Sequence, residues 1–140
     1  MSRVLGLDLG SKRIGVAVSD PTRTIATALT VIQRSGSRQR DHQRIAELVA
    51  EEEATAVIVG LPTNMSGSYG PAARAALSEI EALASVIDVP VTTIDERRTT
   101  VTADQAMIEG GLNGKQRRKV VDRVAAAILL QSWLNREHGR

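Results

Sequence analysis

The sequence predicts an α/β fold in which a mixed five-stranded sheet carries helices on both faces. The chain begins with short apolar runs joined by tight turns, which are typical of an antiparallel meander. It continues with apolar runs separated by segments that have a helical apolar stripe, and these are typical of parallel strands joined by helices. A length of 140 residues with 42% hydrophobic content suits a single domain over residues 1–140.

The first three strands are expected to follow one another through short turns. Residues 4–9 and 14–19 are apolar runs on either side of a Gly-Ser pair, and this arrangement predicts a hairpin. A turn signal at 20–23 precedes a third strand over 25–33, which is rich in Thr, Ile and Val. These strands therefore form the antiparallel part of the sheet.

The rest of the chain alternates helices and strands. Ser37 is a candidate N-cap for a helix that ends near residue 53, because its hydroxyl can accept a backbone hydrogen bond. Residues 56–60 and 90–95 predict the fourth and fifth strands, parallel to the first. The remaining predicted helices cover 71–86, 99–109 and 116–137.

The composition excludes several classes of protein. The chain has no cysteine, so structural disulfides and thiolate zinc sites are excluded. No apolar run approaches the roughly 18–20 residues of a membrane span, and the N-terminus lacks the apolar core of a signal peptide. We therefore expect a cytoplasmic protein that does not enter a membrane.

Positive charge is concentrated locally, although the formal net charge is only +2. Local basic clusters are the usual electrostatic footprint for nucleic acid, and a solvated helix face is the alternative. Tyr69 and Trp133 are the only aromatic residues, so binding is expected to depend on phosphates and shape rather than on base stacking. The candidate phosphate-binding residues are Lys12, Arg13, Arg97, Lys115, Arg117, Arg118 and Arg123.

Asp8 occupies an unusual position for a charged residue. Side chains alternate faces along a strand, so Asp8 shares a face with Val4 and Gly6 and projects over small residues of the hairpin. A buried charge must be paired or must coordinate a metal. Asp8 is therefore a candidate metal ligand, and the alternative is an aspartate at a strand end that hydrogen-bonds the turn.

Two further carboxylates could join Asp8. Glu96 follows the fifth strand, and Asp122 lies in the last helix, where Ala125 and Ala126 at helical spacing would let the helix approach the sheet. Alternatively, Asp122 pairs with Arg118 on an exposed surface. Clustered carboxylates repel one another unless a cation compensates them. Oxygen ligands favour Mg²⁺ or Mn²⁺, and paired ions of this kind support phosphodiester hydrolysis.

Four segments resemble the bacterial YqgF/RuvX family, in the family's order and over essentially the whole chain. They are Gly6-Leu7-Asp8-Leu9-Gly10, Gly60-Leu61-Pro62, Asp95-Glu96-Arg97-Arg98-Thr99-Thr100 and Asp122-Arg123-Val124-Ala125-Ala126-Ala127-Ile128-Leu129. The resemblance implies a ribonuclease H-like fold with strand order 3-2-1-4-5, in which strand 2 is antiparallel. Where the family often has Asp before Gly, this chain has Ser66-Gly67. Asn64 still matches and remains a candidate substrate contact.

The resemblance also implies a nuclease with a two-metal-ion mechanism. Its catalytic and metal-binding residues would be Asp8, Glu96 and Asp122, with Asp8 bridging two Mg²⁺ or Mn²⁺ ions, and its product would carry a 5′-phosphate. The family allows two substrates: the 5′ end of precursor 16S rRNA during ribosome biogenesis, and four-way DNA (Holliday) junctions. Junction resolution needs a two-fold dimer. Since stable interfaces are enriched in aromatic residues, we expect a monomer or weak homodimer and favour rRNA processing.

Two other functions remain open at this point. The Asp-Leu-Gly-Ser segment also resembles the phosphate hairpin of sugar kinases and actin-like proteins, but those proteins enclose a nucleotide between two domains. The other possibility is a non-catalytic RNA-binding assembly factor that kept the fold. The presence of all three carboxylates in their motifs argues against it.

Overall fold

Five strands of the computed structural model form one sheet in the order β3-β2-β1-β4-β5. The structure describes residues 2–62, 70–96 and 114–139, without the side chains of 114–123. The elements are β1 (Arg3–Leu9), β2 (Arg13–Ser19), β3 (Ala26–Gln33), α1 (Arg38–Glu51), β4 (Ala54–Leu61), α2 (Pro71–Ala84), β5 (Val91–Asp95) and α4 (Gly114–Glu137).

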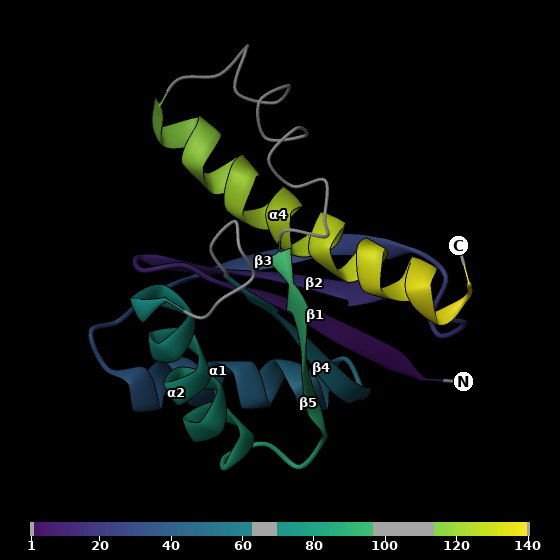
Figure 1. The fold of residues 1–140 in the computed structure, drawn as a ribbon, viewed down its shortest axis with the longest axis horizontal. Coiled ribbons are helices and arrows are strands. Elements are labelled where there is room, and N and C mark those ends of the chain that lie inside the picture. Colours follow the sequence, from purple (N-terminus) through teal and green to yellow (C-terminus); the bar gives the residue numbers. More distant parts are fainter. Residues whose placement is uncertain (1, 63–69, 97–113, 140) are drawn as a thin grey trace.

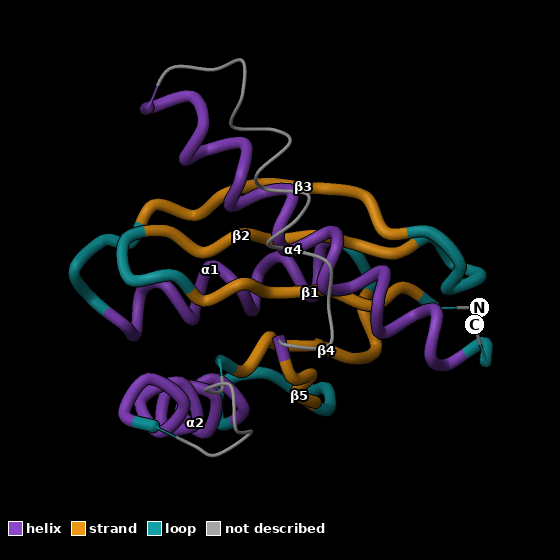
Figure 2. Tube along the Cα trace, turned by 45° about the horizontal axis from the view of Figure 1, so that its top comes forward, coloured by secondary structure: helices purple, strands orange, loops and turns teal. Residues whose placement is uncertain are grey.

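The sheet is mixed, as the sequence predicts. β2 runs antiparallel to both β1 and β3, whereas β1, β4 and β5 run parallel to one another. Figure 2 shows the five strands side by side in this order. Short turns join the antiparallel strands. Helix α1 connects β3 to β4 across the sheet, and α2 makes the longer connection that the parallel neighbours β4 and β5 require. The predicted fold class, strand order and antiparallel second strand are therefore confirmed.

Each face of the sheet has its own apolar cluster. Leu5 and Leu7 of β1 lie opposite Val18 and Val16 of β2 and belong to the cluster that packs against α1 and α2. Val4 on the other face belongs to the cluster that packs against α4. Figure 1 shows the sheet between α4 on one side and α1 and α2 on the other. The alternation expected from the sequence is thus observed on both faces.

The element boundaries agree closely with the sequence patterns. The Ser37 hydroxyl accepts a hydrogen bond from the Arg40 backbone nitrogen at 3.3 Å, which confirms Ser37 as the N-cap of α1. The helix expected over 99–109 and most of the loop expected over 61–70 lie outside the described residues.

Helix α4 rests directly on β1 at a glycine. A Cβ on Gly6 would lie 2.7 Å from the Leu130 Cβ and 3.3 Å from the Ala126 carbonyl oxygen. At the far end of α4, the His138 ring lies 2.6 Å from the Arg23 carbonyl, and Arg23 donates to the Ser2 hydroxyl beside the start of β1. Because the last turn of α4 lies near the first residues of β1, the helix runs antiparallel to this strand.

Substituting Gly6 with alanine is expected to lower the free energy of unfolding by about 1–3 kcal/mol, because the added methyl must push α4 off the sheet. Chemical denaturation measures the loss. Gly70→Ala is the control, since a Cβ there would meet nothing within 4 Å, and it should have the smaller effect. Equal stability of wild type and Gly6→Ala would contradict the close contact between α4 and β1.

Candidate active site

Asp8 lies at the carboxyl end of β1, on the face of the sheet that α4 covers. This placement follows from alternation, because Gly6, two residues earlier, contacts α4. Across the hairpin, Asp8 lies opposite Gly15, which is buried. The predicted surroundings of small residues are therefore present beside this half-buried carboxylate.

The side chain of Glu96, which follows β5, lies on the same face of the sheet, over a glycine of β4. Gly60 lies opposite Ile94 of β5, and a Cβ on Gly60 would be 3.0 Å from Glu96 Oε1 and 2.2 Å from Leu129 Cδ1. The Glu96 side chain thus covers Gly60 beneath α4. Since Leu7 lies opposite Val59, Gly60 continues β4 beside Asp8. Two carboxylates therefore flank a position that has no side chain of its own.

The sequence motifs alone predict no role for Gly60. Its signal was a glycine at the end of an otherwise apolar, β-branched run, which often marks a close approach of another group to the backbone. In the structure, this approach is made by the carboxylate of Glu96 and by the side chain of Leu129.

The surroundings of Glu96 disfavour its ionised form. Burial raises its pKa above the ordinary value, and the negative charge of neighbouring Asp95 raises it further. Both causes disfavour the charged form and would be relieved by a cation close to the carboxylate. Carboxylate oxygens are ligands that Mg²⁺ and Mn²⁺ prefer, so the donor set fits the predicted metal.

Asp122 lies within α4, one turn before Ala126. Ala126 is the residue whose carbonyl lies over Gly6. Four helix residues advance about 6 Å, and two strand residues advance about 6.6 Å. Since α4 runs antiparallel to β1, one turn back from Ala126 along the helix corresponds to about two residues forward along the strand. The Asp122 backbone is therefore displaced from the position above Gly6 in the direction of Asp8. The Asp122 side chain lies outside the described part of the structure.

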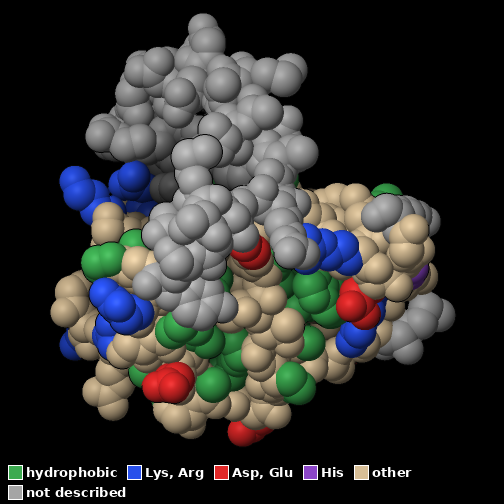
Figure 3. Space-filling view, viewed as in Figure 1, with side chains coloured by type: hydrophobic (Ala, Val, Ile, Leu, Met, Phe, Trp, Pro, Cys, Tyr) green, Lys and Arg blue, Asp and Glu red, His purple; other side chains and the backbone are tan. Residues whose placement is uncertain are grey.

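The candidate phosphate-binding residues are only partly described. Lys12 is exposed in the β1–β2 turn and Arg13 begins β2, so both lie at the same end of β1 as Asp8. Figure 3 shows the described Lys and Arg side chains of one face in separate groups, interspersed with acidic and apolar residues. The remaining candidates fall outside the described side chains: Asn64, Arg97, Lys115, Arg117, Arg118 and Arg123.

Among the side chains that the structure describes, no group of three His, Cys, Asp or Glu residues could hold a metal ion. Asp122, the third ligand expected from the sequence, lies outside these described side chains. The predicted metal-binding set therefore consists of two carboxylates on one face of the sheet and a third in the helix that covers this face.

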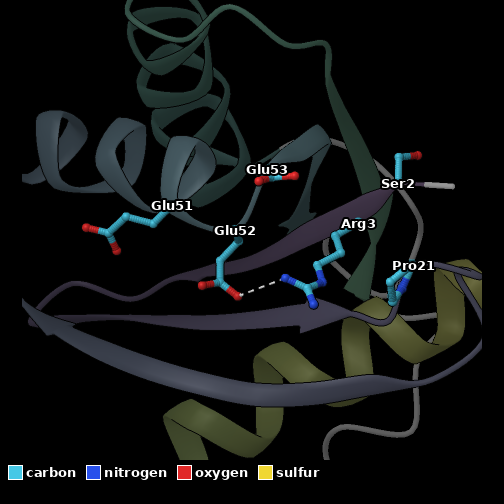
Figure 4. Close-up of a pocket in the computed structure, with 6 residues that line it drawn as sticks. All are labelled: Ser2, Arg3, Pro21, Glu51, Glu52 and Glu53. Carbon is cyan, nitrogen blue, oxygen red and sulfur yellow. Dashed lines mark ion pairs between the residues drawn. The ribbon is translucent and has the colours of Figure 1, made fainter.

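A cavity of about 310 Å³ lies elsewhere, beside the first residues of β1. Figure 4 shows three successive glutamates around it, and Arg3 lies 4.0 Å from Glu52. Ser2 and Pro21 also line the cavity. An acidic lining of this kind repels phosphate groups, so this cavity does not extend a nucleic-acid surface.

The comparisons with known proteins concern the family and the fold of this chain. A family model described as "RuvX: Holliday junction resolvase" matches residues 2–136. The chain belongs to the RuvX family. The resemblance seen in the sequence motifs is therefore confirmed, and with it the expectation of a nuclease.

Several RuvX relatives carry the provisional name pre-16S rRNA nuclease. The relative from Pelotomaculum thermopropionicum is 44% identical over 133 residues, which cover 95% of this chain and 86% of the relative. The relative from Roseiflexus sp. strain RS-1 is also 44% identical over 133 residues, covering 95% of this chain and 94% of the relative. The relative from Thermoanaerobacter pseudethanolicus is 40% identical, and the match covers 99% of each chain.

Among solved structures, this RuvX chain is similar to Thermus thermophilus RuvC in complex with a Holliday junction substrate. The TM-score is 0.62 with 22% identity, and the match covers 99% of this chain and 97% of RuvC. A second Thermus thermophilus RuvC structure gives a TM-score of 0.57. At this level of identity the similarity concerns the fold, and it confirms the ribonuclease H-like architecture.

Proposed function

We propose that this RuvX protein is a divalent-metal-dependent nuclease that processes the 5′ end of precursor 16S rRNA in ribosome biogenesis. The observation that carries the proposal is the position of Asp8 and Glu96. They flank Gly60 on one face of the sheet, under the helix that contains Asp122. Such a group of carboxylates suits hard cations and phosphodiester hydrolysis.

Asp8, Glu96 and Asp122 would hold the two Mg²⁺ or Mn²⁺ ions. When bound, such ions activate a water molecule and stabilise the leaving oxygen of the cleaved phosphodiester. The chain itself supplies the rigid support: Gly6 and Gly60 let α4 and Glu96 approach the sheet closely. The exposed Lys12 lies at the same end, where a cationic side chain would orient the phosphate backbone.

Nucleic-acid affinity is expected to depend on phosphate neutralisation and to fall steeply with salt. Replacing Arg117 and Arg118 with alanine should weaken binding to every sequence alike. It should also flatten the slope of log affinity against log salt by about one unit per lost contact. Fluorescence anisotropy over a salt series measures both quantities. A sequence-specific loss with an unchanged slope would contradict a role in phosphate binding.

Two observations favour precursor rRNA over DNA junctions as the substrate. The relatives with the rRNA name are 40–46% identical to this chain, whereas the RuvC complex is 22% identical. Trp133, one of only two aromatic residues, packs partly buried against the apolar cluster under α4. This leaves little aromatic surface for a stable dimer interface, so we propose a monomer or weak homodimer.

Junction resolution is the alternative function, because the family model is described as a Holliday junction resolvase. Sedimentation of the purified protein, followed by cleavage assays on precursor 16S rRNA and a mobile four-way junction with Mg²⁺ or Mn²⁺, separates the two. We expect a monomer that cleaves the RNA at or near the mature 5′ end. Paired symmetric nicks by a stable dimer, with the RNA intact, would reverse the choice of substrate.

We further propose that residues 1–140 act as one ribonuclease H-like nuclease domain in the cytoplasm, on precursor ribosomes. The five strands of the described structure belong to one sheet, with helices on both faces. No helix among the described residues is both long and apolar enough to cross a membrane.

A further inference from the structure

A buried ionic cluster lies on the face of the sheet away from α4. Arg34, directly after β3, donates from its two terminal nitrogens to the two carboxylate oxygens of Glu79 in α2, at 2.9 Å each. His42 in α1 lies against the same carboxylate, with 2.8 Å between Nε2 and Oε2. The side chains of His42 and Glu79 are only 3% and 9% exposed. The cluster therefore ties β3, α1 and α2 together in a largely dry environment.

Arg34 also holds the turn that follows Asp8. Its Nε donates to the Gly10 carbonyl at 2.7 Å, and its backbone nitrogen donates to the Lys12 carbonyl at 3.0 Å. The Gly10 amide in turn donates to the Asp8 carbonyl at 3.1 Å. The turn is tight, because a Cβ on Gly10 would lie 2.5 Å from the Arg13 carbonyl oxygen. One arginine thus fixes the backbone at the end of β1.

A contribution to stability alone does not account for this ion pair. Burial by itself would raise the pKa of Glu79, but the hydrogen bonds from Arg34 and His42 lower it on balance, so the carboxylate is ionised at neutral pH. Placing both charges here carries a desolvation penalty, and an apolar pair of similar volume is often at least as stable. An apolar side chain, however, could not donate to the Gly10 carbonyl.

The planar guanidinium suits this double task. Two of its nitrogens bind Glu79 side by side, and this fork leaves Nε directed at Gly10. Lysine would supply a charge for Glu79 but no rigid fork and no second fixed donor. The geometry therefore requires arginine for the contact with the turn, rather than for charge neutralisation.

We propose that Arg34, oriented by Glu79, is a positioning residue for the nuclease reaction. It holds the 10–13 turn and so places the Asp8 carboxylate for metal binding and Lys12 for phosphate contact. It acts through the backbone, from the opposite face of the sheet, and touches neither metal nor substrate. This inference rests on the proposed nuclease function.

The test compares Arg34→Lys with wild type in kcat, KM, Mn²⁺ affinity and amide exchange of residues 10–13. We expect kcat to fall about 10- to 100-fold, as for other residues that support metal ligands, with a smaller change in KM. We also expect weaker Mn²⁺ binding and faster exchange in the turn. Arg23→Lys is the matched control, because it loses hydrogen bonds to Ser2 and Thr55 at the other end of the sheet. It should leave kcat and turn exchange unchanged.

A second variant separates positioning from folding. Arg34→Met combined with Glu79→Gln removes both buried charges and keeps an acceptor for His42, so the melting temperature should stay closer to that of wild type while kcat remains low. Wild-type kcat and turn exchange in a folded Arg34 variant would overturn the proposal, as would equal losses of kcat in the Arg34 and Arg23 variants. If wild type cleaves no nucleic acid, the proposed function fails. Turn exchange and Mn²⁺ affinity would still decide the positioning role.

Discussion

Replacing Asp8 with asparagine is expected to abolish metal-dependent cleavage while leaving the fold intact. The change removes the charge of the carboxylate at the carboxyl end of β1 and adds no bulk. For a residue at the centre of the chemistry, we expect kcat to fall by at least about 10³-fold. Without divalent ions, thermal stability should stay the same or rise, because one of several like charges is removed.

A matched control for this variant is Asp88→Asn, which makes the same chemical change at an exposed position far along the chain. It should cleave as wild type does. Cleavage rates and melting curves with and without Mg²⁺ complete the experiment. Wild-type turnover by folded Asp8→Asn would exclude the carboxylate from catalysis.

Glu96→Gln is expected to have opposite effects on activity and stability. Activity should be lost, because the amide cannot replace a charged metal ligand. Stability at neutral pH without metal should rise, because burial and Asp95 disfavour the ionised carboxylate and raise its pKa above the ordinary value of 4.5. Glu81→Gln on the exposed face of α2 is the matched control and should change neither quantity.

The stability gain of Glu96→Gln should depend on pH with a definite sign. A carboxyl whose pKa is raised by folding binds its proton more tightly in the native state, so wild-type stability falls as pH rises through the window above 4.5. The difference between variant and wild type should therefore shrink as pH is lowered and vanish below about 4.5. A difference that grows toward acid pH would contradict the assigned environment of Glu96.

Much of the fold could be predicted because its signals are local. Alternation in β1 predicted that Val4, Gly6 and Asp8 share one face of the sheet, and in the structure Val4 packs toward α4 while Leu5 and Leu7 pack on the other face. Ser37 marked the start of α1 because an N-cap depends on one hydroxyl and nearby backbone amides. The strand order, by contrast, depends on long-range pairing and came from the family resemblance.

The contacts that organise the site were not predictable from sequence patterns. Nothing local in the sequence indicates that Gly60 lies beneath Glu96, since their contact depends on the register of β4 with β5. The Arg34–Glu79 pair joins residues 45 positions apart, from elements that meet only in the folded chain. The roles of Asp8, Glu96 and Asp122 remain predictions. The structure shows that Asp8 and Glu96 lie on the same face of the sheet.

The most direct test of the carboxylate centre is an anomalous difference map from crystals of the wild-type protein containing Mn²⁺. We expect manganese bound by carboxylate oxygens of both Asp8 and Glu96, with Asp122 from α4 completing the site. Manganese bound only elsewhere, for example among the glutamates of residues 51–53, would contradict it. So would manganese at Asp8 with the Asp122 carboxylate directed away from the ion.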